Sequence, residues 1–264
     1  MFYTYCSSSY VHWLYILIRS IRRVHPTIPI LVHFIEEVDG HIKLLKHSDP
    51  YLKIESAIIK PDSRWQDKSL SREQRGAIFL EARLKDTLEA SKQEDFDTMI
   101  VMDTDLLVRK PLEGIINPMR LFDFGAVIRG KATCKPLPAH LETSAALYSL
   151  RKSGIQVLEQ IVSIASTSTK IRGISRGDWF WDQACHTEAV FQTSAKVYTI
   201  CRERYLSSRP FEHDSAIWNG NFRATQGKAA YTFFEKELAT LDPLGITAKT
   251  LDFKIDIDKS LIVK

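Results

Sequence analysis

Short apolar segments alternate with amphipathic ones as far as Asp105, and this order restricts the possible folds more than any other feature of the sequence. The β-rich segments are Phe2 to Cys6, Ile28 to Ile35, Lys53 to Ile59 and Thr98 to Met102. Between them, residues 10–24 and 73–91 repeat apolar side chains at helical spacing. Strands that alternate with helices in this way predict an α/β fold, with a mostly parallel sheet and helices on both faces.

The order of elements is looser after Asp105, although further strands and helices are expected. Strand character recurs at residues 124–128, 143–150 and 196–200, and helical spacing recurs at 154–165, 180–191 and 229–238. Lys131 to His140 is Pro-rich and predicts a loop, while Lys170 to Gly177 is basic, contains glycine and predicts a mobile loop. The alternating residues from Ile246 onward predict an edge strand or an interaction segment.

The composition is that of a folded protein of ordinary polarity. With 264 residues and 44% hydrophobic content, the chain can bury a large core without disulfides or a structural metal. The net charge of +4 is small and the basic residues are dispersed, which argues against nucleic acid as a partner. A weakly basic surface suits an anionic substrate and is compatible with peripheral association with an anionic membrane face.

The cysteines and the apolar runs point to a cytoplasmic location. The spacing of Cys6, Cys134, Cys185 and Cys201 contains no C-x-x-C pair and is too sparse for a disulfide scaffold, so we expect reduced, mostly buried thiols. The apolar run Val11 to Ile18 is short, and basic residues follow it instead of preceding it, unlike a signal peptide. No apolar stretch reaches the length of a transmembrane helix.

The strongest chemical signal is the acidic triplet Asp103-Thr104-Asp105, which directly follows an apolar strand. In parallel α/β sheets, ligand-binding groups lie at the carboxyl ends of the strands. Two carboxylates this close repel each other, and a divalent cation relieves the repulsion. Mg²⁺ and Mn²⁺ bind carboxylate oxygens together with phosphate oxygens of a substrate, so Asp103 and Asp105 are candidate metal ligands. The alternative is a turn in which Asp103 caps a helix or Asp105 faces solvent.

A second cluster of candidates lies in the aromatic segment from Asp178 to Gln183. Tryptophan faces pack against the C–H surfaces of sugars, and carboxylates accept hydrogen bonds from sugar hydroxyls. Asp182 and Gln183 are therefore candidates for sugar binding. We expect Asp178 to cap the helix that follows, and we expect His186 on that helix to be structural.

Basic and aromatic side chains are candidates for binding a nucleotide. Arg83, on the second long helix, can bind phosphate oxygens through two guanidinium nitrogens, or it is an ordinary surface arginine. Arg72 and Arg75 are alternatives if residues 69–76 form a loop over the site. Tyr5 or Tyr10, at the end of the first strand and after it, can stack on a base, or they are core tyrosines.

The stretch from Phe96 through the triplet to Leu112 resembles the D-x-D segment of GT-A nucleotide-diphospho-sugar transferases. It is closest to the glycosyltransferase family 8 pattern of glycogenin and related galactosyltransferases. Ala82-Arg83-Leu84 is similar to the helix whose arginine faces the donor. Trp181-Asp182-Gln183 resembles the D-Q element that lines the sugar, and residues 143–150 resemble the family's later strand. The resemblance covers about residues 2 to 230.

The resemblance implies a metal-dependent glycosyltransferase with a Rossmann-like GT-A fold and Mn²⁺ or Mg²⁺ as cofactor. It implies one catalytic domain over residues 1–240, with a nucleotide-binding half (1–112) and a donor-sugar and acceptor half (113–240), before a tail (241–264). It also implies that Asp103, Thr104 and Asp105 meet the metal and the diphosphate. A UDP-sugar donor, a glycan or lipid-linked saccharide acceptor and retention of anomeric configuration follow from the family; no oligomeric state does.

Two departures from the family pattern are visible. The family's Asn-x-Gly signature is replaced by Thr143-Ser144-Ala145. The family's third metal ligand, a late histidine in an H-x-x-G-x-x-K pattern, has no direct counterpart, because Trp218 stands about where it would be. His213, a few residues upstream, is the candidate replacement as metal ligand, and Lys228 is a candidate contact for the diphosphate.

Two other functions stay open at the level of the sequence. One is a degenerate transferase fold that binds nucleotide without turnover, which metal-dependent binding without donor hydrolysis would reveal. The other is a phosphatase of the haloacid dehalogenase type, with Asp103 as nucleophile. That motif usually lies near the N-terminus and continues to a threonine, whereas here Leu107 takes that position after a long preceding segment.

Overall fold

A computed structural model describes residues 1–36, 49–60, 63–128, 143–178, 180–206, 215–219 and 240. The loop expected at 131–140, the helix expected at 229–238 and the tail from Ile246 lie outside these ranges. His213 and Lys228 lie outside them as well.

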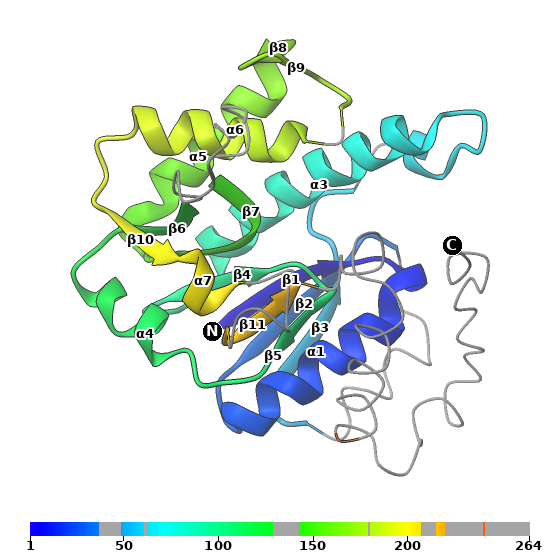
Figure 1. The fold of residues 1–264 in the computed structure, drawn as a ribbon. Coiled ribbons are helices and arrows are strands. Elements are labelled where there is room, and N and C mark those ends of the chain that lie inside the picture. Colours follow the sequence, from blue (N-terminus) through cyan, green and yellow to red (C-terminus); the bar gives the residue numbers. More distant parts are fainter. Residues whose placement is uncertain are drawn as a thin grey trace, which may run out of the picture.

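A seven-stranded sheet with the order β10-β6-β7-β4-β1-β2-β3 forms the centre of the molecule (Figure 1). Its strands are β1 (Phe2–Cys6), β2 (Ile30–Phe34), β3 (Leu52–Ser56), β4 (Met99–Met102), β6 (Phe124–Ile128), β7 (Thr143–Leu150) and β10 (Val197–Cys201). Neighbouring strands of this sheet are parallel except where β7 lies antiparallel between β4 and β6. The amino end of β7 therefore lies beside the carboxyl end of β4.

Helices cover both faces of the sheet. Figure 1 shows α1 (Val11–Val24) on one face, and α3 (Arg72–Gln93), α5 (Ile155–Thr167) and α6 (Trp181–Gln192) on the other. Each face has its own buried apolar cluster: Leu14 and Leu17 of α1 belong to one, and Leu84 of α3, Leu158 of α5 and Ala184 of α6 belong to the other. The sheet is buried on both sides, as the apolar strand segments predict.

Short elements complete the described part of the chain. They are η1 (Ser8–Tyr10), η2 (Ser63–Gln66), α4 (Glu113–Ile116), η3 (Pro118–Arg120), η5 (Lys152–Gly154) and α7 (Arg202–Tyr205). β5 (Leu106–Val108) pairs antiparallel with β11 (Ile217–Asn219), and β8 (Lys170–Ile171) pairs with β9 (Ile174–Ser175). None of the described helices is both long and apolar enough to cross a bilayer.

The α/β class and the mostly parallel sheet predicted from the sequence are confirmed, but two local predictions are wrong. Residues 69–76 are not a loop over the site, because Ser71 caps α3: its hydroxyl accepts a hydrogen bond from Gln74 N at 3.2 Å, and Gln74 Oε1 accepts one from Ser71 N at 2.9 Å. Arg72 and Arg75 therefore lie in the first turn of α3. Asp178 does not cap α6, since its Oδ2 accepts a hydrogen bond from Ser175 N at 2.8 Å and Phe180 is the N-cap residue.

The segment expected as a mobile loop, Lys170 to Gly177, contains the β8–β9 hairpin. Arg172 Nε lies 2.7 Å from Glu188 of α6, and Arg176 Nη2 lies 2.6 Å from Glu81 of α3. Two ion pairs thus connect the hairpin to the helical layer. The expectation for the cysteines holds in part, because Cys6 and Cys185 are buried whereas Cys201 is exposed.

Candidate active site

The acidic triplet occupies the carboxyl end of β4 and is fixed by both neighbouring strands. Asp103 N donates a hydrogen bond to Ala146 O of β7 at 2.9 Å. On the other side, Thr104 Oγ1 donates to Tyr5 O of β1 at 2.9 Å, and the Thr104 side chain is buried. β5 begins directly after Asp105, so the alternative in which Asp103 caps a helix is excluded. The two half-buried carboxylates are held at the edge where parallel α/β sheets bind ligands.

Arg83 reaches the triplet from α3. Its residue is only 8% exposed, so the alternative of an ordinary surface arginine is wrong. Arg83 Nη1 lies 2.5 Å from Asp103 Oδ1, and Nη2 donates a hydrogen bond to Ala145 O at 3.1 Å. Ala145 is accessible to this donor because the pairing of β6 with β7 shifts between Ala126 and Val127 and passes over residues 145–147. The irregular strand thus supplies a carbonyl that helps to hold the guanidinium.

The charges of Arg83, Asp103 and Asp182 influence one another. Burial acts to lower the pKa of Arg83, but the negative charges of Asp103 and Asp182 and the hydrogen bond to Asp103 help to outweigh it, so the pKa lies above its usual range. Arg83 is therefore a permanent cation. Asp182, in the first turn of α6, is 7% exposed, and its burial raises its pKa to about 6, with Arg83 opposing and Asp103 adding to the shift. Asp182 consequently changes charge close to neutral pH.

Several buried polar atoms around this charge cluster have no hydrogen-bond partner among the described residues. They include Gln183 Oε1, His186 Nε2 and Tyr5 Oη. Because buried polar groups are nearly always satisfied, these atoms take their donors or acceptors from solvent, from a ligand or from residues outside the described ranges.

His186 fits the structural role expected of it. Its ring packs against Tyr148 with the centroids 4.8 Å apart, and it is 2% exposed. Burial, followed by the nearby charge of Arg83, lowers its pKa to about 3. His186 is therefore neutral at physiological pH and adds no second positive charge beside Arg83.

The two tyrosines proposed for the base have different environments. Tyr5 is 3% exposed and its ring meets Phe79 edge-on at 5.3 Å, so its faces are not presented to a ligand. Tyr10, just before α1, is 42% exposed. The loop between them is held by Glu36, which accepts hydrogen bonds from Ser8 N at 2.8 Å and from Ser8 Oγ at 3.0 Å. Of the two, Tyr10 is the more exposed.

Two acidic residues, Glu36 and Asp86, were not singled out from the sequence. Glu36 follows the second strand and therefore lies at the same edge of the sheet as the acidic triplet. Its position after a predicted strand could have been used to identify it from the sequence. Asp86, fully buried on α3, accepts hydrogen bonds from Tyr3 Oη at 3.0 Å and from Ile59 N at 2.8 Å, and it also contacts His33 Nδ1. The sequence could have indicated Asp86, because two charged residues, Arg83 and Asp86, lie on the core-facing side of the second long helix.

The residues present fit a divalent cation in their chemistry. Asp103 and Asp105 offer carboxylate oxygens, which Mg²⁺ and Mn²⁺ prefer, and both side chains are half-buried at the carboxyl end of β4. The described residues contain no group of three His, Cys, Asp or Glu side chains that could hold a metal. Trp218 lies on β11, is 2% exposed and has the Arg109 guanidinium 3.9 Å above its ring, so it takes no part in such a site.

Solved glycosyltransferases share this fold. The galactosyltransferase LgtC, in complex with donor and acceptor sugar analogs, matches with a TM-score of 0.55 and 13% identity over 83% of this chain and 86% of that chain. Glycosyltransferase GlyE of Streptococcus pneumoniae TIGR4 (TM-score 0.54, 9% identity) and mouse xyloside xylosyltransferase 1 (0.52, 10%) each match over 83% of this chain, and over 54% and 97% of their own lengths. No protein-family profile and no curated protein sequence matches. At such low identity the likeness shows the fold alone, and that fold is GT-A.

Proposed function

We propose that this protein is a metal-dependent glycosyltransferase that moves a sugar from a nucleotide diphosphate donor, with a UDP-sugar favoured, to a saccharide or glycoconjugate acceptor. The observation that carries the proposal is the convergence of Asp103, Asp105, Arg83 and Asp182 at the carboxyl end of β4 in a GT-A sheet. A solved relative in fold, LgtC, is described with donor and acceptor sugar analogs, which supports the same two classes of ligand here.

Asp103 and Asp105 would hold Mn²⁺ or Mg²⁺ together with the donor diphosphate. A cation bound there would neutralise the negative charge of the departing nucleoside diphosphate. Thr104 keeps the two carboxylates in place through its bond to Tyr5 O. Arg83 holds Asp103 from the helical side and places a second positive charge beside the diphosphate.

Asp182 and Gln183 would bind the donor sugar. Gln183 Oε1 is a buried acceptor without a hydrogen-bond partner among the described residues, and a sugar hydroxyl can satisfy it. Above pH 6 the ionised Asp182 accepts hydrogen bonds from hydroxyls and stabilises positive charge at the anomeric carbon. During transfer the bond from the anomeric carbon to the diphosphate oxygen breaks, a bond to the acceptor oxygen forms, and the proton of the acceptor hydroxyl passes to the departing diphosphate. We propose retention of configuration on the resemblance to family 8.

The remaining roles rest on sequence position. Tyr10 would stack on the base, because it is the exposed tyrosine of the loop after β1. Tyr5 contributes through its carbonyl rather than its ring. We propose His213 as the third metal ligand and Lys228 as a contact of the diphosphate from the sequence alone. The single catalytic domain over residues 1–240 is proposed on the same basis.

One alternative keeps a specific observation in its favour. The close Arg83–Asp103 ion pair and the loss of the late histidine at Trp218 suit a protein that binds nucleotide without turnover. The position of the acidic triplet argues against the haloacid dehalogenase alternative, because Asp103 follows the fourth strand of the chain rather than a strand near the N-terminus.

Release of nucleoside diphosphate from a panel of UDP-, GDP- and dTDP-sugars, with Mn²⁺ and with EDTA, tests the proposal. We expect one donor class to be cleaved only with metal. Asp103→Asn and Asp105→Asn should each lower the rate by on the order of 100-fold, because each removes a charged ligand from the diphosphate site. Asp95→Asn, an exposed aspartate elsewhere, is the matched control. Turnover that survives EDTA or both substitutions contradicts the proposal, and binding without turnover supports the inactive alternative.

A further inference from the structure

Asp86 of α3 is a fully buried carboxylate to which the proposed reaction assigns no role. It accepts hydrogen bonds from Tyr3 Oη of β1 at 3.0 Å and from Ile59 N, in the segment after β3, at 2.8 Å. Its Oδ2 also contacts Nδ1 of His33, which is 1% exposed on β2. A single side chain of α3 is thus joined to two neighbouring strands and to the segment that follows a third.

Arg83 lies three residues before Asp86 and connects the same helix to the other side of β1. Its guanidinium meets Asp103, directly after β4, and Ala145 O of β7. In the strand order, β4 and β7 lie on one side of β1, whereas β2 and β3 lie on the other. Residues three apart share a face of a helix. A rotation of α3 that displaced Asp86 from its partners would therefore displace the guanidinium of Arg83 as well.

The geometry around Asp86 is fixed by buried groups. Tyr3 is 1% exposed, and its ring meets that of His33 edge-on with the centroids 5.4 Å apart. Burial, followed by the charge of Asp86, raises the pKa of Tyr3 well above its usual range, so Tyr3 keeps its proton and acts as a donor. A buried ion pair is often no more stabilising than apolar side chains of the same volume. What it adds is hydrogen bonds of defined direction, which restrict the orientation of α3.

We infer that Asp86 is a positioning residue for the donor site: its bonds to β1, β2 and the segment after β3 orient α3 so that the Arg83 guanidinium stays beside Asp103. The inference rests on the proposed function, because it requires the diphosphate of the donor to lie beside Arg83. Asp86 acts through Arg83 and does not touch the ligand itself. The effect is measurable because a displacement of about 1 Å at a binding group can lower a rate by on the order of 100-fold.

A double-mutant cycle on nucleotide binding tests this connection. Calorimetry with UDP, GDP and dTDP, each with Mn²⁺, first identifies the nucleoside diphosphate that binds the wild type. Arg83→Met should weaken its binding by about 10-fold, the effect of losing one charge-assisted hydrogen bond. Asp86→Leu should weaken binding by about 5-fold in the wild-type background and by less than about 2-fold in Arg83→Met, because the guanidinium that it displaces is already absent.

Tyr3→Phe is a second, milder substitution that covers the case in which Asp86→Leu fails to fold. It removes one hydrogen-bond donor to Asp86 and keeps the ring against His33. It should therefore weaken nucleotide binding by about 3-fold, again only while Arg83 is present. Both variants are compared with the wild type well below the melting transition, with circular dichroism as the check that they are folded.

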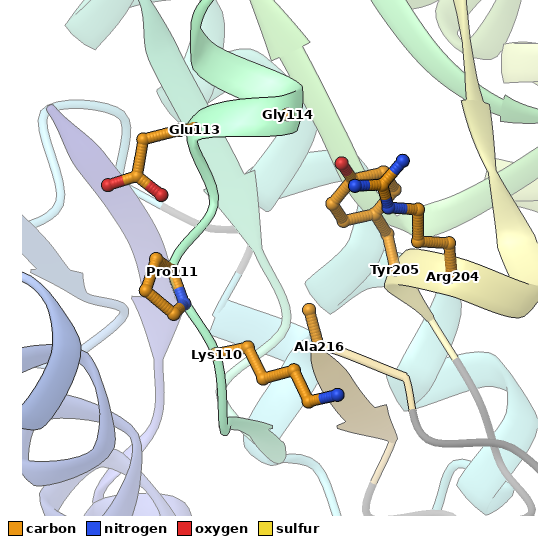
Figure 2. Close-up of a pocket in the computed structure, with 7 residues that line it drawn as sticks. All are labelled: Lys110, Pro111, Glu113, Gly114, Arg204, Tyr205 and Ala216. Carbon is orange, nitrogen blue, oxygen red and sulfur yellow. The ribbon is translucent and has the colours of Figure 1, made fainter.

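Gly114→Ala is the control for a general loss of stability. Gly114 belongs to α4, and Figure 2 shows it with Tyr205 at a cavity to which no residue of the Asp86 network contributes. A Cβ atom at Gly114 would lie 1.7 Å from Tyr205 Oη and 2.8 Å from Cζ, so the substitution should lower the melting temperature through overpacking. Tyr205 belongs to the apolar cluster on the opposite face of the sheet from Leu84 of α3, so nucleotide binding should stay within about 2-fold of the wild type.

The outcomes separate this inference from the proposed function. Equal weakening by Asp86→Leu or Tyr3→Phe with and without Arg83 would show that Asp86 does not act through the guanidinium, and it overturns the inference. Wild-type affinity in both variants, or a loss of affinity in Gly114→Ala that matches theirs, also overturns it. In each of these cases the wild type still binds nucleotide with metal, and the transferase proposal stands. If none of the three nucleotides binds the wild type, the proposed function fails and the inference fails with it.

Discussion

Arg83 is the residue on which the charges of the candidate active site depend. It is only 8% exposed, its Nη1 lies 2.5 Å from Asp103 Oδ1, and it also feels the charge of Asp182.

 Without Arg83, the carboxylates of Asp103 and Asp182 would lack a nearby positive charge in a poorly solvated site. Its role is therefore testable through stability as well as through activity.

Arg83→Met should lower the free energy of unfolding by about 3 kcal/mol, because it leaves the carboxylates of a buried ion pair without their partner. Urea denaturation of the metal-free protein measures the effect. Lys85→Met, on the same helix but 40% exposed and paired only with Glu81 at the surface, is the control and should change stability by less than about 1 kcal/mol. Equal effects of the two substitutions would show that Arg83 is not a buried counter-ion.

Asp182 gives the site a pH dependence whose sign follows from its raised pKa. Because the folded pKa is about 6 and the usual value is 3.8, the folded state holds the proton more tightly than the unfolded chain. The stability that the protonated form contributes is fully present below pH 3.8 and is lost as the pH rises through 6. Burying the charged form should then cost up to about 3 kcal/mol at neutral pH.

Asp182→Asn removes this titration, so its melting temperature relative to wild type should rise as the pH increases from about 5 to about 8. Asp95→Asn, at an exposed position, should show no such trend. Donor turnover by the wild type should fall as the pH drops through 6, because the sugar site needs the ionised carboxylate. A difference in melting temperature that stays constant with pH would mean that Asp182 does not titrate in this range.

At the level of elements, η5 approaches the backbone of the segment before β6 closely. A Cβ atom at Gly154 would lie 2.0 Å from Asp123 O, a backbone atom that already accepts a hydrogen bond from Arg151 N at 3.0 Å. Gly154→Ala should therefore displace the start of α5 and lower stability by about 2 kcal/mol, as overpacking does.

Chemical denaturation measures this effect, with Ser163→Ala as the control. Ser163 is exposed on α5, so its substitution should change stability by no more than about 0.5 kcal/mol. If Gly154→Ala is as stable as Ser163→Ala, the close approach of η5 to Asp123 does not exist in solution.

The elements also show what the sequence could predict. The main strands and helices were predictable because their apolar periodicity is strong, and the triplet was predictable because a buried strand leads directly into it. The short pair β5–β11 was not, since its partners are far apart in the chain. On α3, the leucine register located a helix but not its buried polar face, where Arg83 and Asp86 lie.

At the scale of the whole molecule, the sheet joins these elements into one site. Alternation of strands and helices predicted parallel pairing, but it did not predict that β7 would run antiparallel between β4 and β6. That reversal brings the amino end of β7 to the acidic triplet. The resulting contacts, Asp103 N to Ala146 O and Arg83 to Ala145 O, depend on tertiary pairing and have no local sequence signal.

The most direct test of the central claim is the shift in thermal unfolding with UDP, GDP, CMP and dTDP, each with Mn²⁺ and with EDTA, in the wild type and in Asp105→Ala. We predict that one nucleotide stabilises the wild type only with Mn²⁺, by about 2.7 kcal/mol at a hundred times its dissociation constant, and that Asp105→Ala abolishes the shift. The absence of a shift with every nucleotide, or a shift unchanged by EDTA and by Asp105→Ala, would contradict a metal-dependent donor site at the end of β4.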